Sequence, residues 1–267
     1  MLPDERRDEI AEQVTRRGTA SVEDLMNRFA VSKMTVWRDL RRLHAQGRLR
    51  MVRGGAQRML PASEPGVLAK RIVRRQTKDR IAEAAVHRFV RSGDVIALEG
   101  GTTVMHVLAH VSGLSLTVIT NGLLTLNAAA DVSESVDVLG CGGILRQPSQ
   151  TFVGPEAVRF FAGHAADIAF ISATGCSAQR GLTDPNPLEI EVKQAMAAAA
   201  RRVIALVDSS KFAVESLKTV VPLERLYALV SEGAVPEELR AALHRHGVEL
   251  FVAAPDARPV DRAGGVE

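Results

Sequence analysis

Apolar side chains at helical spacing mark the centre of the first sixty residues. Val36, Leu40 and Leu43 stand at i, i+4 and i+7, so they share one face of a predicted helix over 33–46, and Ser32 before them is a typical N-cap. Two shorter helices and an alternating hairpin with a Gly-Gly turn surround it, at about 4–17, 22–29 and 48–56. This order of elements is typical of a winged helix-turn-helix.

The pattern changes after about residue 78, where short apolar runs alternate with helical segments. Strands are predicted in DVIALE, LTVITN, VDVLG, DIAFISAT, RVIALVD, LYALVS and ELFVA. Helices are predicted at about 78–91, 103–111, 122–130 and 187–200. This alternation predicts an α/β fold with a mostly parallel, doubly wound sheet.

These patterns divide the chain into four predicted parts. Residues 1–58 form the winged helix-turn-helix domain, 59–77 a linker, 78–254 an α/β domain and 255–267 a disordered tail. The linker is predicted because LPASEPGV contains two prolines and a glycine, which favour turns over regular structure.

Composition adds a location and a broad class. Of 267 residues, 46% are apolar, enough for a substantial core, yet no apolar run reaches the roughly 18 residues of a membrane span. The charged start lacks the apolar stretch of a signal peptide, so we expect a cytosolic protein. The two cysteines, Cys141 and Cys176, have no partners at zinc-site spacing, and buried inert thiols are expected.

Charge is distributed unevenly. Residues 1–58 carry 13 Lys and Arg against 8 Asp and Glu, a net +5, and residues 59–80 carry +4. Since the whole chain is +3, residues 81–267 carry −6. A basic first third favours a polyanion as the partner of that part, and a solvated basic face without a partner is the alternative.

The outward face of the third helix carries the candidate DNA contacts. Guanidinium groups suit both guanine edges and phosphates, and the first turn of a recognition helix lies nearest the bases. We therefore assign Lys33, Met34, Thr35 and Arg38 to base readout and Arg41 and Arg42 to the backbone. Ser32, Trp37 and the hairpin residues Arg50 and Arg53 complete the candidate surface. A small helical domain with solvated arginines is the alternative.

Two residues of this helix invite a structural interpretation. Packing of Trp37 on the domain surface is favoured over stacking on DNA. Asp39 is interpreted as structural, either pairing with a nearby arginine or capping a backbone amide.

A Gly-Gly-Thr-Thr turn follows the first strand of the α/β domain. Glycines let the backbone approach closely, and amides and hydroxyls at a helix start favour an anion such as phosphate. A plain strand–helix turn is the alternative, and the chain has no GxxxxGK[ST] or GxGxxG pattern for a nucleotide. The candidate effector-binding residues of this loop are Glu99, Gly100, Gly101, Thr102 and Thr103.

Polar groups follow other predicted strands as well. Open α/β sheets bind ligands beyond the carboxyl ends of their strands, so Asn121, Gly143 and Lys211 are expected near the same pocket. Lys211 would supply the positive charge that a phosphate favours.

At these residues a family resemblance becomes clear. VSKMTVWRDLRRLHAQGRLRMVRGGA resembles the recognition-helix-and-wing signature of the DeoR family of bacterial transcription regulators. LEGGTT, TN, GGILR, GLT, EIEVKQAM and DSSKF resemble its C-terminal domain, so the similarity extends to about residue 230. Trp37 stands where the family usually has Arg, Arg53 where it has His, and Glu99 where it has Asp.

The resemblance implies a sensor domain similar to the ribose-phosphate isomerase and CoA-transferase-like fold, and a sugar-phosphate effector. It also implies that Glu189 and Lys193 border the pocket. Their spacing of four on a helix predicts instead a surface ion pair, which is the simpler interpretation. The family is mostly repressive.

We therefore expect a repressor of a carbohydrate or polyol catabolic operon, whose affinity for double-stranded operator DNA is modulated by a phosphorylated sugar or polyol. A homo-oligomer, dimer or tetramer, is expected because one helix-turn-helix reads only a few base pairs. We expect no membrane partner, no cofactor and no metal; His106 and His110 lie at i and i+4 but lack a third ligand.

An enzyme is the alternative from another class: a sugar-phosphate isomerase or deaminase-like protein fused to a DNA-binding domain. Glu99, Glu189 and Asp208 are the candidate bases for such chemistry. No paired carboxylates or His-Asp arrangement favours it, so no catalytic residue is assigned.

Overall fold

A computed structural model describes residues 3–46, 48–52, 54–57 and 66–253. The chain forms two compact units, Met1–Val73 and Arg74–Glu267, which are described separately. Among the described residues, no helix has both the length and the apolar surface that a membrane span requires.

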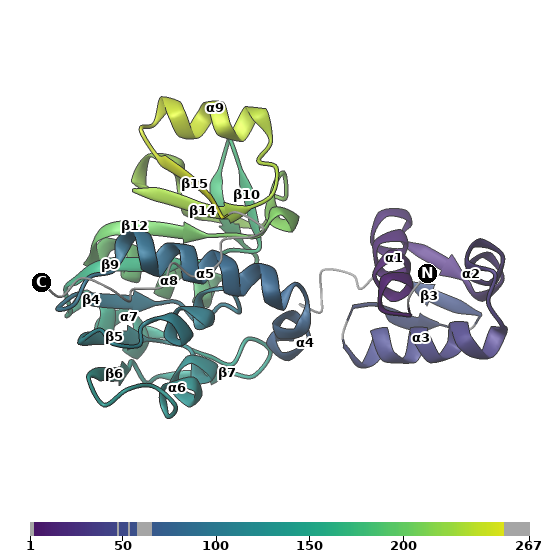
Figure 1. Cartoon of the computed structure of the whole chain (residues 1–267), viewed down its shortest axis with the longest axis horizontal. Helices are drawn as coiled ribbons and strands as arrows, with labels where there is room; N and C mark the ends of the chain where they lie inside the picture. Colours follow the sequence, from purple (N-terminus) through teal and green to yellow (C-terminus); the bar gives the residue numbers. More distant parts are fainter. Residues whose placement is uncertain (1–2, 47, 53, 58–65, 254–267) are drawn as a thin grey trace, which may run out of the picture. The chain divides into compact units, whose positions relative to one another are not determined.

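The first unit is a winged helix-turn-helix (Figure 1). Its helices are α1 (Pro3–Arg17), α2 (Val22–Phe29), α3 (Lys33–Ala45) and α4 (Val67–Ile72). Its strands β1 (Thr19–Ser21), β2 (Arg50–Val52) and β3 (Gly55–Gln57) form an antiparallel sheet with β3 in the middle. The hairpin β2–β3 is the wing.

Helix α3 follows its predicted pattern. The Ser32 hydroxyl accepts a hydrogen bond from the Thr35 amide at 3.2 Å, which satisfies one of the free donors at the helix start. Val36, Leu40 and Leu43 are fully buried in the core of the unit. The predicted cap, helix and core face are confirmed.

Strand β1 was not expected, because three residues carry too little alternation to predict a strand. It pairs along β3, where a Cβ at Gly55 would lie 2.2 Å from the Ala20 carbonyl oxygen. A glycine at this position therefore lets the wing close against β1.

The second unit contains a parallel sheet in the order β15-β14-β12-β9-β4-β5-β6 (Figure 1). Every neighbouring pair in it is parallel. Its strands are β4 (Val95–Leu98), β5 (Leu116–Thr120), β6 (Val136–Gly140), β9 (Ala166–Ile171), β12 (Ala200–Leu206), β14 (Ala228–Glu232) and β15 (Glu249–Ala253). The predicted parallel sheet is confirmed.

Helices cover both faces of this sheet. They are α5 (Arg75–Phe89), α6 (Leu123–Ala129), α7 (Pro155–Ala162), α8 (Pro187–Ala199) and α9 (Glu237–Arg245), with the 3₁₀ helices η1 (Val104–His110), η2 (Ser209–Lys211) and η3 (Leu223–Arg225). On β4, Ile96 and Leu98 pack in the core layer with α5 and η1, and Ala97 packs in the layer with α7, α8 and α9. The predicted doubly wound arrangement is confirmed.

Two small antiparallel sheets complete the described part of the unit. They are β7 (Ile144–Arg146) with β8 (Thr151–Val153), and β10 (Gly175–Ser177) with β11 (Gly181–Asp184) and β13 (Lys218–Val221). These short strands, and helices α7 and α9, were not predicted.

The structure differs from the sequence prediction in two places, and a third prediction is not tested. The range 59–77, predicted as a linker, contains α4 and the start of α5. The helix predicted at 103–111 is the 3₁₀ helix η1. The predicted tail 255–267 lies outside the described residues. Apolar periodicity is too weak in such short segments to separate a turn of helix from a loop.

Candidate nucleic-acid interface and candidate anion site

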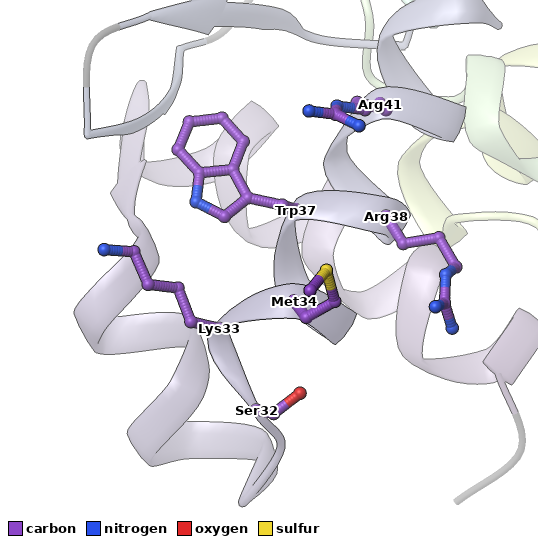
Figure 2. A pocket seen from close by; sticks show the side chains of 6 residues that line it. All are labelled: Ser32, Lys33, Met34, Trp37, Arg38 and Arg41. Carbon is purple, nitrogen blue, oxygen red and sulfur yellow. The ribbon is translucent and has the colours of Figure 1, made fainter.

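The outward face of α3 is a cationic surface around an apolar centre. Lys33, Arg38, Arg41 and Arg42 are all exposed. Met34, in the first turn, has 72% of its surface exposed. A hollow of about 680 Å³ lies on this face, lined by Ser32, Lys33, Met34, Trp37, Arg38 and Arg41 (Figure 2). Six of the predicted DNA-contact residues therefore line one open surface.

The other predicted contacts are arranged differently. The Thr35 hydroxyl lies 3.0 Å from that of Ser32, so both side chains also serve the cap of α3. Trp37 is partly buried against the core of the unit, in agreement with its predicted packing role. Arg50 is exposed on β2, and Arg53 lies outside the described residues.

Asp39 fixes α3 to α1 from the buried side. Its carboxylate accepts from Arg6 Nε at 2.7 Å and from Arg7 Nη1 at 3.3 Å, and Asp39 is only 2% exposed. The predicted structural pairing is confirmed, but its partners are more than thirty positions away in sequence. Removing one partner of an ion pair this buried is strongly destabilising, so the Asp39 contacts hold α3 against α1.

The loop 99–103 lies at the carboxyl end of β4, packed against the next strand's loop. The Gly100 amide donates to Asn121 Oδ1 at 3.0 Å, and Asn121 Nδ2 donates to the Phe152 carbonyl at 3.2 Å. A Cβ at Gly100 would lie 2.4 Å from Thr151 Cγ2. Asn121, 1% exposed, therefore positions the loop, and the Gly100 amide is already engaged by it.

Gly143, predicted beside the same pocket, lies in the loop between β6 and β7. Its φ is +106°, and a Cβ there would lie 2.8 Å from the Val153 carbonyl oxygen. The need for a glycine is therefore explained by the close approach of β8.

Thr102 and Thr103 are buried, so the loop presents little free side-chain surface. The short 3₁₀ helix that follows is a weaker source of aligned amides than the α-helix that was predicted. An anion at this loop would therefore depend more on nearby cations than on a helix dipole.

A buried charged cluster lies beneath the loop, at the carboxyl ends of β4 and β9. Lys193 Nζ contacts Asp184 Oδ2 at 2.6 Å, Glu99 Oε1 at 3.0 Å and the Ser172 carbonyl at 2.9 Å. The side chains come from α8, from β11 and from the end of β4. In the sheet, β5 and β6 lie on one side of β4. The strands β9, β12, β14 and β15 lie on its other side. The cluster thus occupies the topological switch point.

The three charges of this cluster are not equivalent. Burial raises the pKa of Glu99 above its usual range, since Lys193 only partly offsets the loss of water and the Asp184 charge adds to it. Burial also acts on Asp184, but the Lys193 ammonium and the Thr174 amide outweigh it and lower the pKa of Asp184. Against its own burial, the two carboxylates raise the pKa of Lys193. Lys193 and Asp184 form the charged pair, and Glu99 is the carboxyl that gains a proton most readily.

Glu189 belongs to a second network at the edge of the loop. Arg146 Nη1 lies 3.1 Å from Glu189 Oε1, and the Thr151 hydroxyl donates to the same oxygen at 3.3 Å. Glu189 is 7% and Lys193 6% exposed, so the predicted surface ion pair between them is wrong. Each side chain points to partners from other elements, which i, i+4 spacing cannot reveal.

Arg146, on β7, was not predicted as a site residue. The signal for it was the GGILR segment, which entered the family resemblance only as a motif. Its contact with Glu189 brings a guanidinium close to Thr151, the side chain that lies against Gly100.

Lys211, on η2, follows β12. It is partly buried. Burial would raise the pKa of Asp208, but hydrogen bonds from Ser210, whose amide donates to Asp208 Oδ1 at 3.0 Å, and the Lys211 charge outweigh it and lower that pKa. Strand β9 separates β12 from β4, a distance of about 10 Å across the sheet. The sharing of one phosphate by Lys211 and the loop 99–103 stays a prediction.

The remaining candidates have structural explanations. His106 Nδ1 and His110 Nε2 each lie 3.1 Å from Asp79 Oδ1. Within the described residues, no group of three or more His, Cys, Asp and Glu side chains is arranged to hold a metal ion. Cys141 and Cys176 are buried, as predicted, and burial raises the pKa of both thiols to about 12.

The first unit is a helix-turn-helix with an exposed cationic helix, which is typical of a DNA-binding protein. The second unit is an α/β fold with a polar cluster at its switch point, where folds of this kind bind ligands. Residues 6–61 match the DeoR-like helix-turn-helix domain, and residues 73–233 match the DeoR C terminal sensor domain. The chain belongs to the DeoR family of transcription regulators.

Three curated transcription regulators are similar to this chain over most of its length. The HTH-type transcriptional regulator YgbI of Escherichia coli K12 is 32% identical over 95% of this chain and 99% of its own. The HTH-type transcriptional regulator IolR of Bacillus subtilis is 29% identical, with 92% of this chain and 97% of its own covered. The HTH-type transcriptional repressor CsqR of Escherichia coli K12 is 28% identical, over 94% and 96%. Among solved structures, ribose 5-phosphate isomerase A from Neisseria gonorrhoeae matches with 17% identity and a TM-score of 0.36, covering 52% of this chain and 54% of that one.

Proposed function

We propose that this protein represses an operon for carbohydrate or polyol breakdown, and that a phosphorylated sugar or polyol releases it from operator DNA in the cytoplasm. The exposed cationic face of α3 supports the DNA-binding half of the proposal. The polar cluster at the switch point of the sensor unit supports the effector half. A similar protein named as a repressor supports the direction of regulation.

The DNA half predicts different effects for two arginines of α3. Arg38→Ala should weaken binding to a selected operator by about 1–3 kcal/mol, because an arginine near the first turn reaches base edges. Arg42→Ala should weaken binding to all sequences alike and lower the salt slope by about one ion, because it neutralises a phosphate. Fluorescence anisotropy at several salt concentrations measures both, with an operator selected from a random-sequence library.

Arg159→Ala is the matched control, since Arg159 is exposed on α7 of the other unit, where it forms a surface ion pair with Glu156. Wild-type affinity in both α3 variants would contradict the assignment of the recognition helix. The same titrations give the number of chains bound per operator, and we expect at least two.

For the effector we propose a site formed by the loop 99–103, bordered by Arg146, Glu189 and Lys193, with Lys211 as a second source of positive charge. Charge-assisted hydrogen bonds to a phosphate are stronger than neutral ones. Arg146 and Lys211 are less buried than Lys193, so we assign the phosphate to these two cations and the sugar hydroxyls to the carboxyl side of the cluster. We propose that the unit binds its effector without converting it.

Lys211→Ala should therefore weaken effector binding by roughly 1.5–3 kcal/mol. A thermal-shift panel of phosphorylated sugars and polyols identifies a binding compound, and calorimetric titrations with and without operator then compare the variant with the wild type. By linkage, the factor by which effector lowers DNA affinity must equal the factor by which DNA lowers effector affinity.

Lys218→Ala, which removes an exposed lysine of the same unit, should bind the compound like the wild type. The compound should be recovered unchanged after incubation. Equal effector affinity in Lys211→Ala and wild type would rule out a phosphate contact by Lys211.

A further inference from the structure

The apolar centre of the α3 surface has no explanation in phosphate binding. Met34 lies in the first turn of α3 with 72% of its surface exposed, although a thioether gains nothing from water. Trp37, at i+3, is its neighbour on the helix surface, and its ring is partly buried against the core. Both side chains line the same hollow (Figure 2).

Cations surround these two apolar side chains. Lys33 precedes Met34, Arg38 follows it at i+4, and Arg41 lies at the same spacing from Trp37 (Figure 2). A protein or lipid partner with an apolar surface is not the natural complement of such a rim. The natural complement is a polyanion that presents an apolar group between its negative charges. DNA is such a polyanion.

The major groove of unmodified DNA carries one apolar group, the C5 methyl of thymine. Side chains in the first turn of a recognition helix lie closest to base edges, and Met34 is the second residue of α3. Its unbranched, flexible side chain can adapt to a methyl group without a fixed geometry. The half-buried Trp37 lies at i+3 from Met34 and lines the same hollow (Figure 2).

We infer that Met34 is a specificity-determining residue that packs on the methyl group of a thymine in the operator, with Trp37, its neighbour on the helix surface, as a positioning residue. The inference rests on the proposed DNA-binding function and adds a base to it: the half-site contains a thymine opposite the first turn of α3, recognised by its methyl group.

Uracil substitution tests the inference directly, because uracil pairs like thymine but lacks the methyl group. An operator is selected from a random-sequence library with the wild-type full-length chain, and each thymine is then replaced singly by uracil. At one thymine of each half-site, wild-type affinity should fall about fourfold, the effect of one buried methyl group. Met34→Ala should bind the thymine operator about tenfold more weakly and should show no further loss with uracil at that position.

The controls separate this inference from the proposed function. Arg159→Ala should keep the full uracil effect, and unchanged circular dichroism of Met34→Ala should show that removing an exposed side chain leaves the fold intact. A second readout uses Trp37, the single tryptophan of the chain, whose quenching by acrylamide should decrease when operator binds.

Wild-type affinity that is indifferent to uracil at every thymine would overturn the inference while leaving DNA binding established. The same holds for a uracil effect that persists undiminished in Met34→Ala, or for Trp37 quenching that operator does not change. If no sequence is enriched from the library, the proposed function itself fails, and the inference fails with it.

Discussion

Replacing Lys193 with methionine is expected to lower the free energy of unfolding of the α/β unit by about 3–5 kcal/mol, the usual effect of removing one partner from a buried ion pair. Lys193 is 6% exposed and contacts both Glu99 and Asp184. Methionine has a similar length and fills the same space, so no cavity forms. The lost unfolding free energy therefore measures the effect of leaving the two carboxylates without a cation.

The effect of Lys193→Met should depend on pH in a defined direction. Without the ammonium, both buried carboxyls have folded pKa values above their unfolded ones. When the pKa of a carboxyl is higher in the folded state than in the unfolded state, its contribution to stability is present below the unfolded pKa. That contribution is lost as the pH rises through the folded pKa. The variant should therefore lie closer to the wild type at pH 5 than at pH 8. In the wild type the lowered pKa of Asp184 acts oppositely, since its contribution is present above the unfolded value of 3.8 and disappears as pH falls below it.

Urea denaturation followed by circular dichroism at the two pH values measures this. Lys218→Met is the matched control, because that lysine is exposed on β13 and should change the unfolding free energy by less than about 0.5 kcal/mol. The double variant Lys193→Met with Glu99→Gln should regain part of the loss, since it removes one of the two unpaired charges. Wild-type stability of Lys193→Met at pH 8 would contradict the buried cluster.

Replacing Asp39 with alanine is expected to destabilise the helix-turn-helix unit by about 3 kcal/mol, because it removes the buried carboxylate that accepts from two nearly buried guanidinium groups. Arg6 and Arg7 are each 11% exposed at the side chain, and both reach Asp39 from α1. A unit of this size has a total stability of only about 3–9 kcal/mol, so the variant should keep about 0–6 kcal/mol and its unfolding midpoint in urea should fall clearly.

Trp37 makes this measurement specific to one unit. It lies two positions from Asp39 and is the single tryptophan of the chain, so emission excited at 295 nm follows the helix-turn-helix unit alone during urea denaturation. Asp8→Ala is the matched control, since the exposed pair of Asp8 with Arg48 should contribute at most about 1 kcal/mol. Equal midpoints for Asp39→Ala and Asp8→Ala would show that the pair with α1 does not hold α3 in place.

The sequence by itself determined the elements whose signal is local. The cap at Ser32 and the burial of Val36, Leu40 and Leu43 follow from residues within one or two helical turns, and they were predicted correctly. The same holds for the apolar strands of the parallel sheet, because continuous Val, Ile, Leu and Ala runs are typical of strands buried on both faces.

Only the tertiary structure decided which polar groups meet. Asp39 was predicted to pair with an arginine, but nothing in its neighbourhood identifies Arg6 and Arg7 on another helix. Glu189 and Lys193 have the spacing of a surface pair, yet the packing of α8 buries both and gives them partners from different strands. Periodicity records which side of an element is apolar, whereas the partners of a buried charge depend on strand order and helix packing. Those are set by contacts between segments far apart in the chain, which a local pattern does not contain.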